Sequence, residues 1–87
     1  MATFQLKIIT PQAVVFDGPV ESVQAPGGDG YLGVLAGHAP LLTTLQDGKL
    51  TASGAGQGSK SWQVTGGGFL EVHKNKVTVL AQNLSAQ

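Results

Sequence analysis

Two histidines and a few carboxylates are the side chains of this sequence whose types could support catalysis or metal binding. His73 lies two residues after Glu71 in a run with strand-like alternation, so both side chains would point to one face. An imidazole beside a carboxylate can serve as an acid–base pair or as part of a metal site. The other histidine, His38, lies far away in the chain, and no spacing clusters further ligands around either. Because cysteine is absent, disulfides, thiolate metal sites and cysteine nucleophiles are excluded. We therefore predict no catalytic residue, no metal site and no cofactor.

The segment from Gly28 to Gly33 matches the G-x-G-x-x-G spacing of dinucleotide-binding loops. Such a loop needs a helix directly behind it, because the helix N-terminus meets the pyrophosphate. Here Gly37 and Pro40 would end any helix within a turn or two. We predict instead a tight loop that needs a positive φ, with Tyr31 available near its tip as an amphipathic docking contact.

A lysine at a predicted turn suggests a third kind of chemistry. Asp47-Gly48 separates two strand-like runs, residues 41–46 and 49–53, and this dipeptide is a strong signal for a hairpin. Lys49 at the hairpin tip invites comparison with domains that carry a lipoyl or biotinyl group on a tip lysine. Glycine before the lysine and leucine after it differ from the tip sequences of those carriers, and a plain turn explains all three residues.

The elements that position these residues are predicted from short apolar runs of the sequence. The runs alternate with a period of two, they are separated by most of the 13 glycines and 4 prolines, and no long window shows a helical stripe. Eight to ten short strands at this spacing predict an all-β fold, a sandwich of about ten strands or a flattened barrel. The clearest alternating positions are Phe4, Leu6 and Ile8; Leu50 and Ala52; Trp62 and Val64; Leu70 and Val72; and Val77, Val79 and Ala81.

The whole chain, residues 1–87, is expected to form a single β domain. At 87 residues, folding buries about 63% of the unfolded chain's surface, which supports one core and excludes separate substrate and cofactor domains. The polar residues from Gln82 to Gln87 are predicted to be a frayed end. The N-terminal residues fit neither a secretory signal nor an Arg-rich transit pattern.

Charge is scarce in this sequence. Only 11% of the residues are charged, against a usual value of about 25%, and the formal net charge is +0. Such a chain lacks the positive charge that nucleic acids or anionic membranes attract, so neither is an expected partner. Few charges and no net charge also disfavour an isolated, highly soluble monomer, which hints that a partner covers part of the surface.

One uncharged segment, Ala36 to Thr43, concentrates apolar residues around Gly37 and Pro40. Leu42 and the following Leu45 could simply belong to the core. Residues 39–41, however, lie at an irregular boundary where burial on both sides is harder. An uncharged patch at such a place suits the centre of a protein–protein contact.

Five blocks of residues, in order along the chain, carry a family resemblance. They are Phe16-x-Gly18-x-Val20-Glu21-x-Val23, Gly30-x-Leu32-Gly33-Val34, Gly37-His38-Ala39-Pro40-Leu41-Leu42-Thr43, Gly67-Gly68-Phe69-Leu70-Glu71-Val72 and Asn75-x-Val77-Thr78-Val79-Leu80-Ala81. In these blocks, and from about Phe4 to Ala81 as a whole, the sequence resembles the N-terminal β domain of the ε subunit of F-type ATP synthases, called δ in mitochondria.

The resemblance implies a ten-stranded β-sandwich in the rotor's central stalk, without an active site. In that family the domain binds the γ subunit and stands on the ring of c subunits, so it couples proton- or sodium-driven rotation to ATP synthesis. The matching γ-facing residues are His38, Ala39, Pro40, Leu41, Leu42 and Thr43, and the ring-facing loop is Gly28, Asp29, Gly30 and Tyr31. The implied location is the cytoplasmic side of a bacterial inner membrane, or the stromal side of the thylakoid, with membrane contact only through the ring.

Most family members continue with an α-helical hairpin that this sequence does not contain, so we expect neither hairpin-type inhibition nor an ATP site. Ala36 also stands where many relatives have proline.

Two alternatives to this family function stay open. One is an autonomous sandwich that binds a small ligand or carbohydrate, which an exposed Trp62 would favour. The other is the carrier domain, which a lipoyl or biotinyl adduct on Lys49 would establish.

Overall fold

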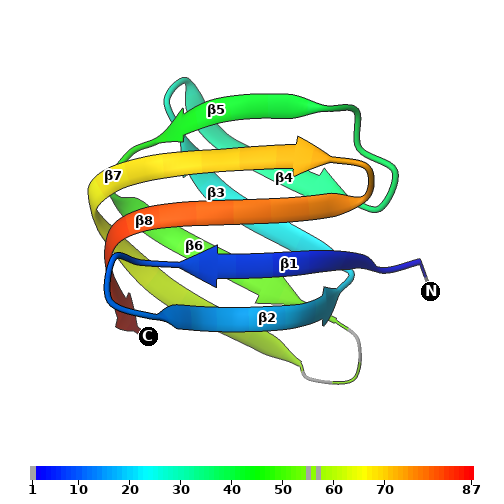
Figure 1. The fold of residues 1–87 in the computed structure, drawn as a ribbon, viewed down its shortest axis with the longest axis horizontal. Coiled ribbons are helices and arrows are strands. Elements are labelled where there is room, and N and C mark those ends of the chain that lie inside the picture. The colour runs from blue at the N-terminus through cyan, green and yellow to red at the C-terminus, as the bar shows by residue number, and fades with distance from the viewer. Residues whose placement is uncertain (1, 55, 57) are drawn as a thin grey trace.

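The fold consists of β-strands throughout the part of the chain that the computed structural model describes, residues 2–54, 56 and 58–87 (Figure 1). The strands are β1 (Phe4–Ile9), β2 (Val14–Val20), β3 (Ser22–Gly27), β4 (Gly30–Leu35), β5 (Leu41–Leu45), β6 (Gly48–Ser53), β7 (Ser59–His73) and β8 (Lys76–Ala86). The predicted all-β class is confirmed.

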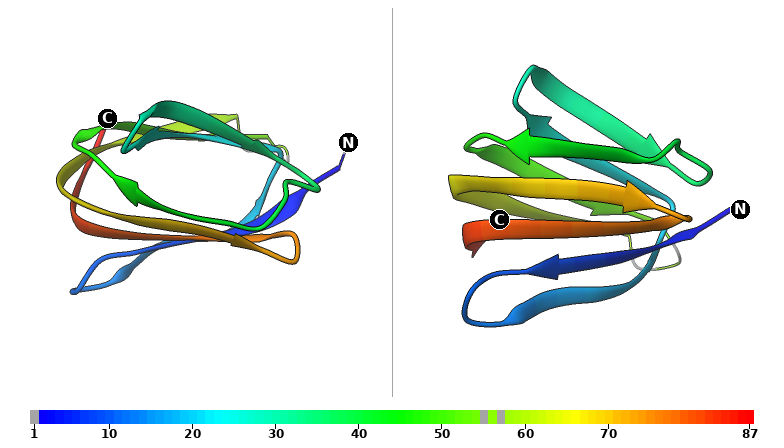
Figure 2. Two further views of the ribbon diagram at one scale, coloured as in Figure 1. Left: turned by 90° about the horizontal axis from the view of Figure 1, so that it is seen from above. Right: turned by 45° about the horizontal axis from the view of Figure 1, so that its top comes forward.

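The strands form two layers that enclose one core (Figure 2). The front layer, nearest the viewer in Figure 1, contains β2, β1, β8, β7 and β5 in that order. The back layer contains β4 and β3, followed by β6, which pairs with both β3 and β7. All pairs are antiparallel except β1 and β8, which run parallel.

A bend in β7 lets one strand serve both layers. Its first part pairs with β6 from Ser59 to Val64, and its last part pairs with β5 from Gly68 to Val72. β8 accompanies β7 through the bend, where the register between them shifts. The count is therefore eight strands and not about ten, because β7 and β8 each supply a strand to both layers.

Glycines and one carboxylate hold this bend. Gly66 and Gly67 have φ values of 85° and 73°, a region that side chains disfavour. The carboxylate of Asp47 accepts hydrogen bonds from both backbone N–H groups, at 2.8 Å from Gly66 and 3.1 Å from Gly67. The bend thus keeps its exposed backbone donors paired although the strand ladder is interrupted there.

Two local predictions are wrong. Asp47-Gly48 does not form a hairpin, because β5 pairs with β7 and β3 while β6 pairs with β3 and β7; the turn connects the two layers instead. The expected frayed end is also wrong for Gln82 to Ala86, which continue β8 and pair with the first part of β7. The last residue, Gln87, still donates its N–H to the Ser61 carbonyl at 3.0 Å.

The period-two alternation correctly identified the core. Every position that the alternation placed on one face is buried, and Val20, Val23, Ala25, Val34 and Leu45 complete the cluster. The accessible surface is 4761 Å², as size scaling predicts for a folded monomer of this mass, about 4,800 Å². One hydrophobic core therefore accounts for the fold of the described residues.

We predict that Gly68→Ala strongly destabilises the protein. A Cβ at this position would overlap the carbonyl oxygen of Leu80, so the ladder between β7 and β8 would have to shift. We expect a loss of roughly 3 kcal/mol or more in the free energy of unfolding, measured by urea denaturation. Gly33→Ala is the control, because its Cβ would meet nothing within 4 Å. The control should change stability by about 0.5 kcal/mol or less; equal losses in both variants would contradict the explanation.

Candidate functional site

The segment His38–Thr43 forms the end of the β4–β5 loop and the first half of β5. Ala39 and Pro40 are exposed, and His38 is half-buried with its Nδ1 2.7 Å from the Ala39 carbonyl oxygen. Leu41 packs against the core, whereas Leu42 points outward with 70% of its surface exposed. The core interpretation therefore holds for Leu45, which is buried, and fails for Leu42.

Leu42 belongs to an apolar face on the outside of the front layer that the sequence analysis missed. Ile9, Leu80 and Phe69 lie opposite one another on three neighbouring strands, and Val14 continues the row beyond Ile9. Phe69 is 52% and Leu80 is 47% exposed. This apolar face is defined by Val14, Ile9, Leu42, Phe69 and Leu80. Its signal in the sequence is an apolar residue at an outward position of an alternating strand, where a polar one is usual.

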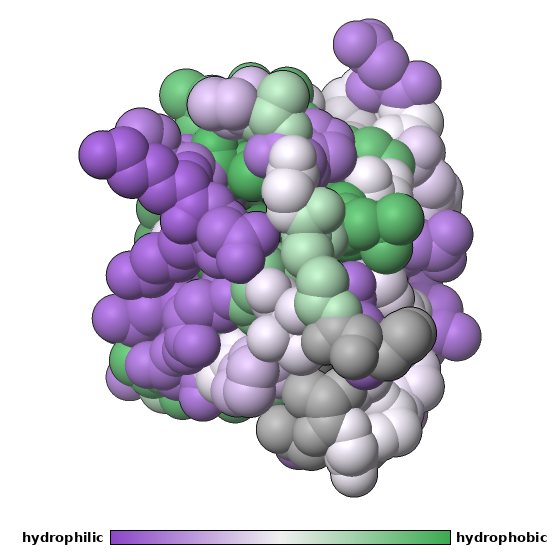
Figure 3. Space-filling model, turned by 90° about the vertical axis from the view of Figure 1, so that its right-hand side faces the viewer, coloured by the Kyte–Doolittle hydropathy of each residue, from purple (hydrophilic) through white to green (hydrophobic). Residues whose placement is uncertain are grey.

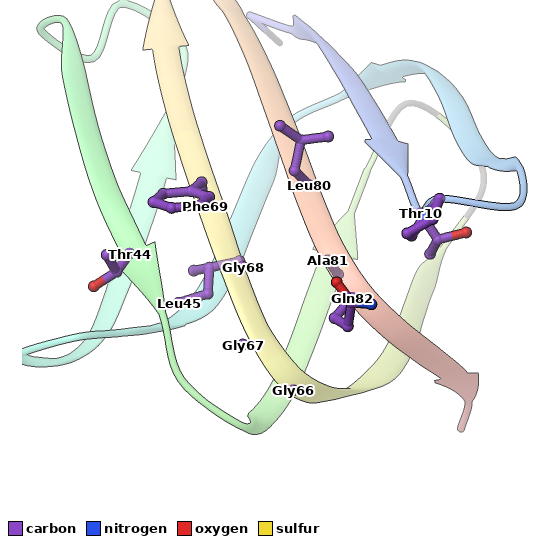
Figure 4. Close-up of a pocket in the computed structure, with 11 residues that line it drawn as sticks. Thr10, Thr44, Leu45, Gly66, Gly67, Gly68, Phe69, Leu80, Ala81 and Gln82 are labelled. Atoms are coloured by element: carbon purple, nitrogen blue, oxygen red, sulfur yellow. The ribbon is translucent and has the colours of Figure 1, made fainter.

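A groove of about 530 Å³ lies along the apolar face at the bend of β7 (Figure 4). Phe69 and Leu80 border it on neighbouring strands, and Thr44 and Thr10 lie at its sides. Its floor includes Gly66, Gly67 and Gly68, which contribute no side chains. Since these glycines are required by the bend, the groove is a consequence of the same geometry that forms the two layers.

The outside of the back layer is polar and nearly uncharged. Gln24, Thr51 and Ser61 lie opposite one another on β3, β6 and β7. The hydroxyl oxygens of Thr51 and Ser61 are 3.1 Å apart and form a hydrogen bond. The two outer faces therefore differ: the front carries a row of apolar side chains on neighbouring strands, whereas the back carries hydrogen-bonding groups on β3, β6 and β7 beside the exposed Tyr31 and Leu35 of β4.

Of the predicted loop Gly28–Tyr31, only Gly28 and Asp29 form the tight turn between β3 and β4, closed by the pair Gly27 and Gly30; Gly30 and Tyr31 already begin β4. Gly30 has a φ of 121°, as expected for a loop that needs glycine. A strand and not a helix follows, so the glycine spacing does not form a nucleotide site. Asp29 is exposed. In Figure 1 this turn lies at the left end of the molecule, opposite the β4–β5 loop at the right.

Tyr31 has a structural role besides its 61% exposure. Its hydroxyl oxygen accepts a hydrogen bond from the backbone N–H of Lys49 at 2.8 Å, which ties β4 to the start of β6. The Gln46 amide likewise donates to the Gly28 carbonyl at 2.6 Å. The turn is therefore fastened to the β5–β6 connection, and Lys49 lies at a strand start rather than at a hairpin tip.

The two histidines lie on different elements, His38 in the β4–β5 loop and His73 at the end of β7. His73 and Glu71 are exposed and project from the same face of β7. Among the described residues, no group of three histidine or acidic side chains could hold a metal ion.

Trp62 is buried, with 8% of its surface exposed, and packs edge-on against Phe16 with ring centroids 6.0 Å apart. Within the same residues, no helix is long and apolar enough to span a membrane.

Comparison with known proteins gives one consistent family. The family model for the β-sandwich domain of the ATP synthase delta/epsilon chain matches residues 3–87. The chain is 45% identical over 82 residues to the ATP synthase epsilon chain of Chlorobium limicola, covering 94% of this chain and 92% of that protein. It is 41% identical over 83 residues to the epsilon chain of Caulobacter vibrioides, covering 95% and 94%.

Other relatives are longer than the matched region. The chain is 41% identical to the epsilon chain of Bradyrhizobium sp. strain BTAi1 but covers only 58% of it. Among solved structures, a chain of the Euglena gracilis mitochondrial ATP synthase (OSCP/F1/c-ring) superposes with a TM-score of 0.90 at 23% identity, with 99% of this chain and 54% of that chain covered. A chain of the Tetrahymena thermophila mitochondrial ATP synthase central stalk and c-ring gives 0.77 at 19%, with 93% and 64% covered.

The two solved structures share the fold of this chain. The first two curated relatives have the same name and match this chain over almost their whole length. Because the family model covers nearly the whole sequence and two relatives above 40% identity align over almost their full length, this chain belongs to the family of ATP synthase delta/epsilon chain β-sandwich domains.

Proposed function

We propose that this protein is a non-catalytic rotor subunit of an F-type ATP synthase, and that it joins the γ subunit to the c-ring. The observation that supports this most directly is the apolar face of the front layer. Leu42 of the segment His38–Thr43 is exposed on the same side of that layer, opposite Glu71 and two residues from Thr44, which lies opposite Phe69. The curated relatives named above are ATP synthase epsilon chains, and from these names we infer that the assembly is an ATP synthase. The protein would lie on the cytoplasmic side of a bacterial inner membrane and contact the membrane only through the ring.

The apolar face has the composition that a permanent interface requires. Leu42, Phe69 and Leu80 expose about half or more of their surfaces, although a half-buried strand usually turns polar residues outward. Full burial of such a side chain contributes about 1.5–3 kcal/mol. The face lies on the outside of one layer, so a single partner surface can cover it. We therefore extend the proposed γ contact from His38–Thr43 to Val14, Ile9, Phe69 and Leu80.

A subunit that transmits torque must resist deformation, and the strand arrangement favours this. β7 and β8 run from one layer into the other, so covalent chain and backbone hydrogen bonds connect the layers directly. The proposed ring-facing turn and the β4–β5 loop lie at opposite ends of a body 33 Å long. Force applied at one end would reach the other through the strands of a closed double layer.

The two alternative functions receive no support. An autonomous ligand-binding sandwich needs an exposed aromatic platform, whereas Trp62 is buried in the core. A carrier domain needs a lysine at a free hairpin tip, whereas the backbone of Lys49 is bound to the Tyr31 hydroxyl and the hairpin is absent.

The experiment that tests the function is co-expression with the γ subunit followed by size-exclusion chromatography. We expect a stable complex of one copy of each chain. A chain that elutes alone at micromolar concentration would contradict the proposal.

We predict that Leu42→Asp weakens binding to γ by about 10-fold to 100-fold, because a carboxylate would be buried in the interface without a partner. Leu41 is unsuitable for this test, since it packs against the core. Leu35→Asp is the matched control: Leu35 is also a strand leucine, is 65% exposed, and lies on the back layer. Calorimetric titration with γ should separate the two variants; similar affinities would argue against the front layer as the interface.

We also predict that Asp29→Lys weakens docking on the c-ring more than binding to γ. Asp29 is exposed in the β3–β4 turn, at the other end of the molecule from the β4–β5 loop, and would face basic groups of the ring. A single exposed pair contributes about 0.2–1 kcal/mol, so charge reversal should cost roughly fivefold in affinity and less at high salt. Asp29→Asn is the control, because it removes the negative charge without adding a positive one. Binding assays with purified ring and with γ should give this ranking, and the opposite ranking would reverse the assignment of the two ends.

A further inference from the structure

We propose that Asn75 is a positioning residue for the γ-docking segment: its side-chain amide holds the β4–β5 loop in the conformation that the partner binds. This inference rests on the function proposed above. It concerns the right-hand end of the molecule in Figure 1, where the β7–β8 turn, the β4–β5 loop and the start of β1 come together. Seen from that end, hydrophilic residues gather on one side and separate hydrophobic patches reach the surface among them (Figure 3).

Asn75 makes three hydrogen bonds to segments that are distant in sequence. Its Oδ1 accepts the backbone N–H of Gly37 at 3.0 Å, and its Nδ2 donates to the carbonyl oxygen of Thr3 at 3.0 Å. Its own carbonyl oxygen accepts the N–H of Gln5 at 3.2 Å. One residue of the β7–β8 turn thereby connects the loop before β5 to the chain before β1.

Asparagine meets two requirements at this position. Its φ is 60°, in the left-handed region, which asparagine tolerates better than most residues. Its amide also carries one acceptor and one donor group, and the structure uses the acceptor toward Gly37 and the donor toward Thr3. Aspartate would keep the acceptor and lose the donor, whereas glycine would keep only the backbone conformation.

The loop itself has mainly local bonds. The N–H of His38 donates to the Leu35 carbonyl at 3.2 Å, and the His38 ring contacts the neighbouring Ala39 carbonyl. The bond from Gly37 to Asn75 instead spans 38 residues and attaches the loop to the front layer, just before the chain enters β5. A docking segment that is already ordered loses less conformational freedom on binding, so this bond should strengthen association.

Three variants test the inference. Asn75→Gly keeps the left-handed backbone and removes both side-chain bonds, whereas Asn75→Asp keeps the acceptor for Gly37. Lys74→Gly is the control, because Lys74 shares the turn with a φ of 51° and leaves the amide of Asn75 intact. The first measurement, amide hydrogen exchange by NMR on the chain alone, needs no partner. We expect faster exchange of the Gly37 N–H in Asn75→Gly only, by about threefold or more, and unchanged exchange of Gly28, which is bonded to Thr44.

The second measurement is the affinity for γ, with thermal unfolding as a check on the fold. Asn75→Gly should bind about 3-fold to 10-fold more weakly, the range expected for one lost hydrogen bond, and Asn75→Asp and Lys74→Gly should bind like the wild type. Wild-type affinity in Asn75→Gly, or unchanged Gly37 exchange, overturns the positioning role and leaves the proposed function standing. A wild-type chain that does not bind γ overturns the function and the docking role together. If Asn75→Gly does not fold, Asn75→Asp decides the question. This variant keeps the acceptor for Gly37, so weaker binding to γ by a folded Asn75→Asp overturns the inference.

Discussion

The bend of β7 at Gly66 and Gly67 is the constraint on which the architecture depends. Inward residues keep the same period on both sides of it, from Trp62 and Val64 to Leu70 and Val72. A straight strand would place all four on one face of one sheet, with nothing to cover them. The bend carries the strand from one layer into the other, so the apolar side chains of both halves belong to the one core between the layers. The carboxylate of Asp47 supports this by binding the two N–H groups that the interrupted ladder leaves open.

The same bend separates the molecule into two outer faces with different roles. On the back layer, hydroxyl and amide groups keep the surface hydrated although few residues are charged. On the front layer, Phe69 and Leu80 stand outward beside a groove that the glycines of the bend leave empty. In a protein with 11% charged residues this division matters, because the exposed apolar row of Phe69 and Leu80 lies on the side that a partner can cover, although Leu35 is also exposed on the back.

Alternation along single strands was sufficient to predict most of the core and the all-β class, because a period of two directly reflects which face a side chain occupies. Pairing between strands was less predictable. Asp47-Gly48 has hairpin chemistry, yet β5 and β6 belong to different layers, and that depends on a bend in a strand further along the chain. Residues 82–86 include three polar side chains, and only Leu84 among them packs against the core, while their backbone still completes a ladder. The role of Asn75 was invisible for a similar reason: its partners, Gly37 and Thr3, are neighbours only in the folded chain.

The parallel pairing of β1 with β8 has a consequence for the order of assembly during synthesis. β1 is translated early, but its backbone groups toward the centre of the front layer find no partner until β8 emerges from the ribosome. The hairpin of β1 and β2 must therefore wait with one edge open, and closing such a long loop is slow. The front layer is therefore completed only once β8, the last of the described strands, pairs with β1, and until then that edge of β1 has no strand partner.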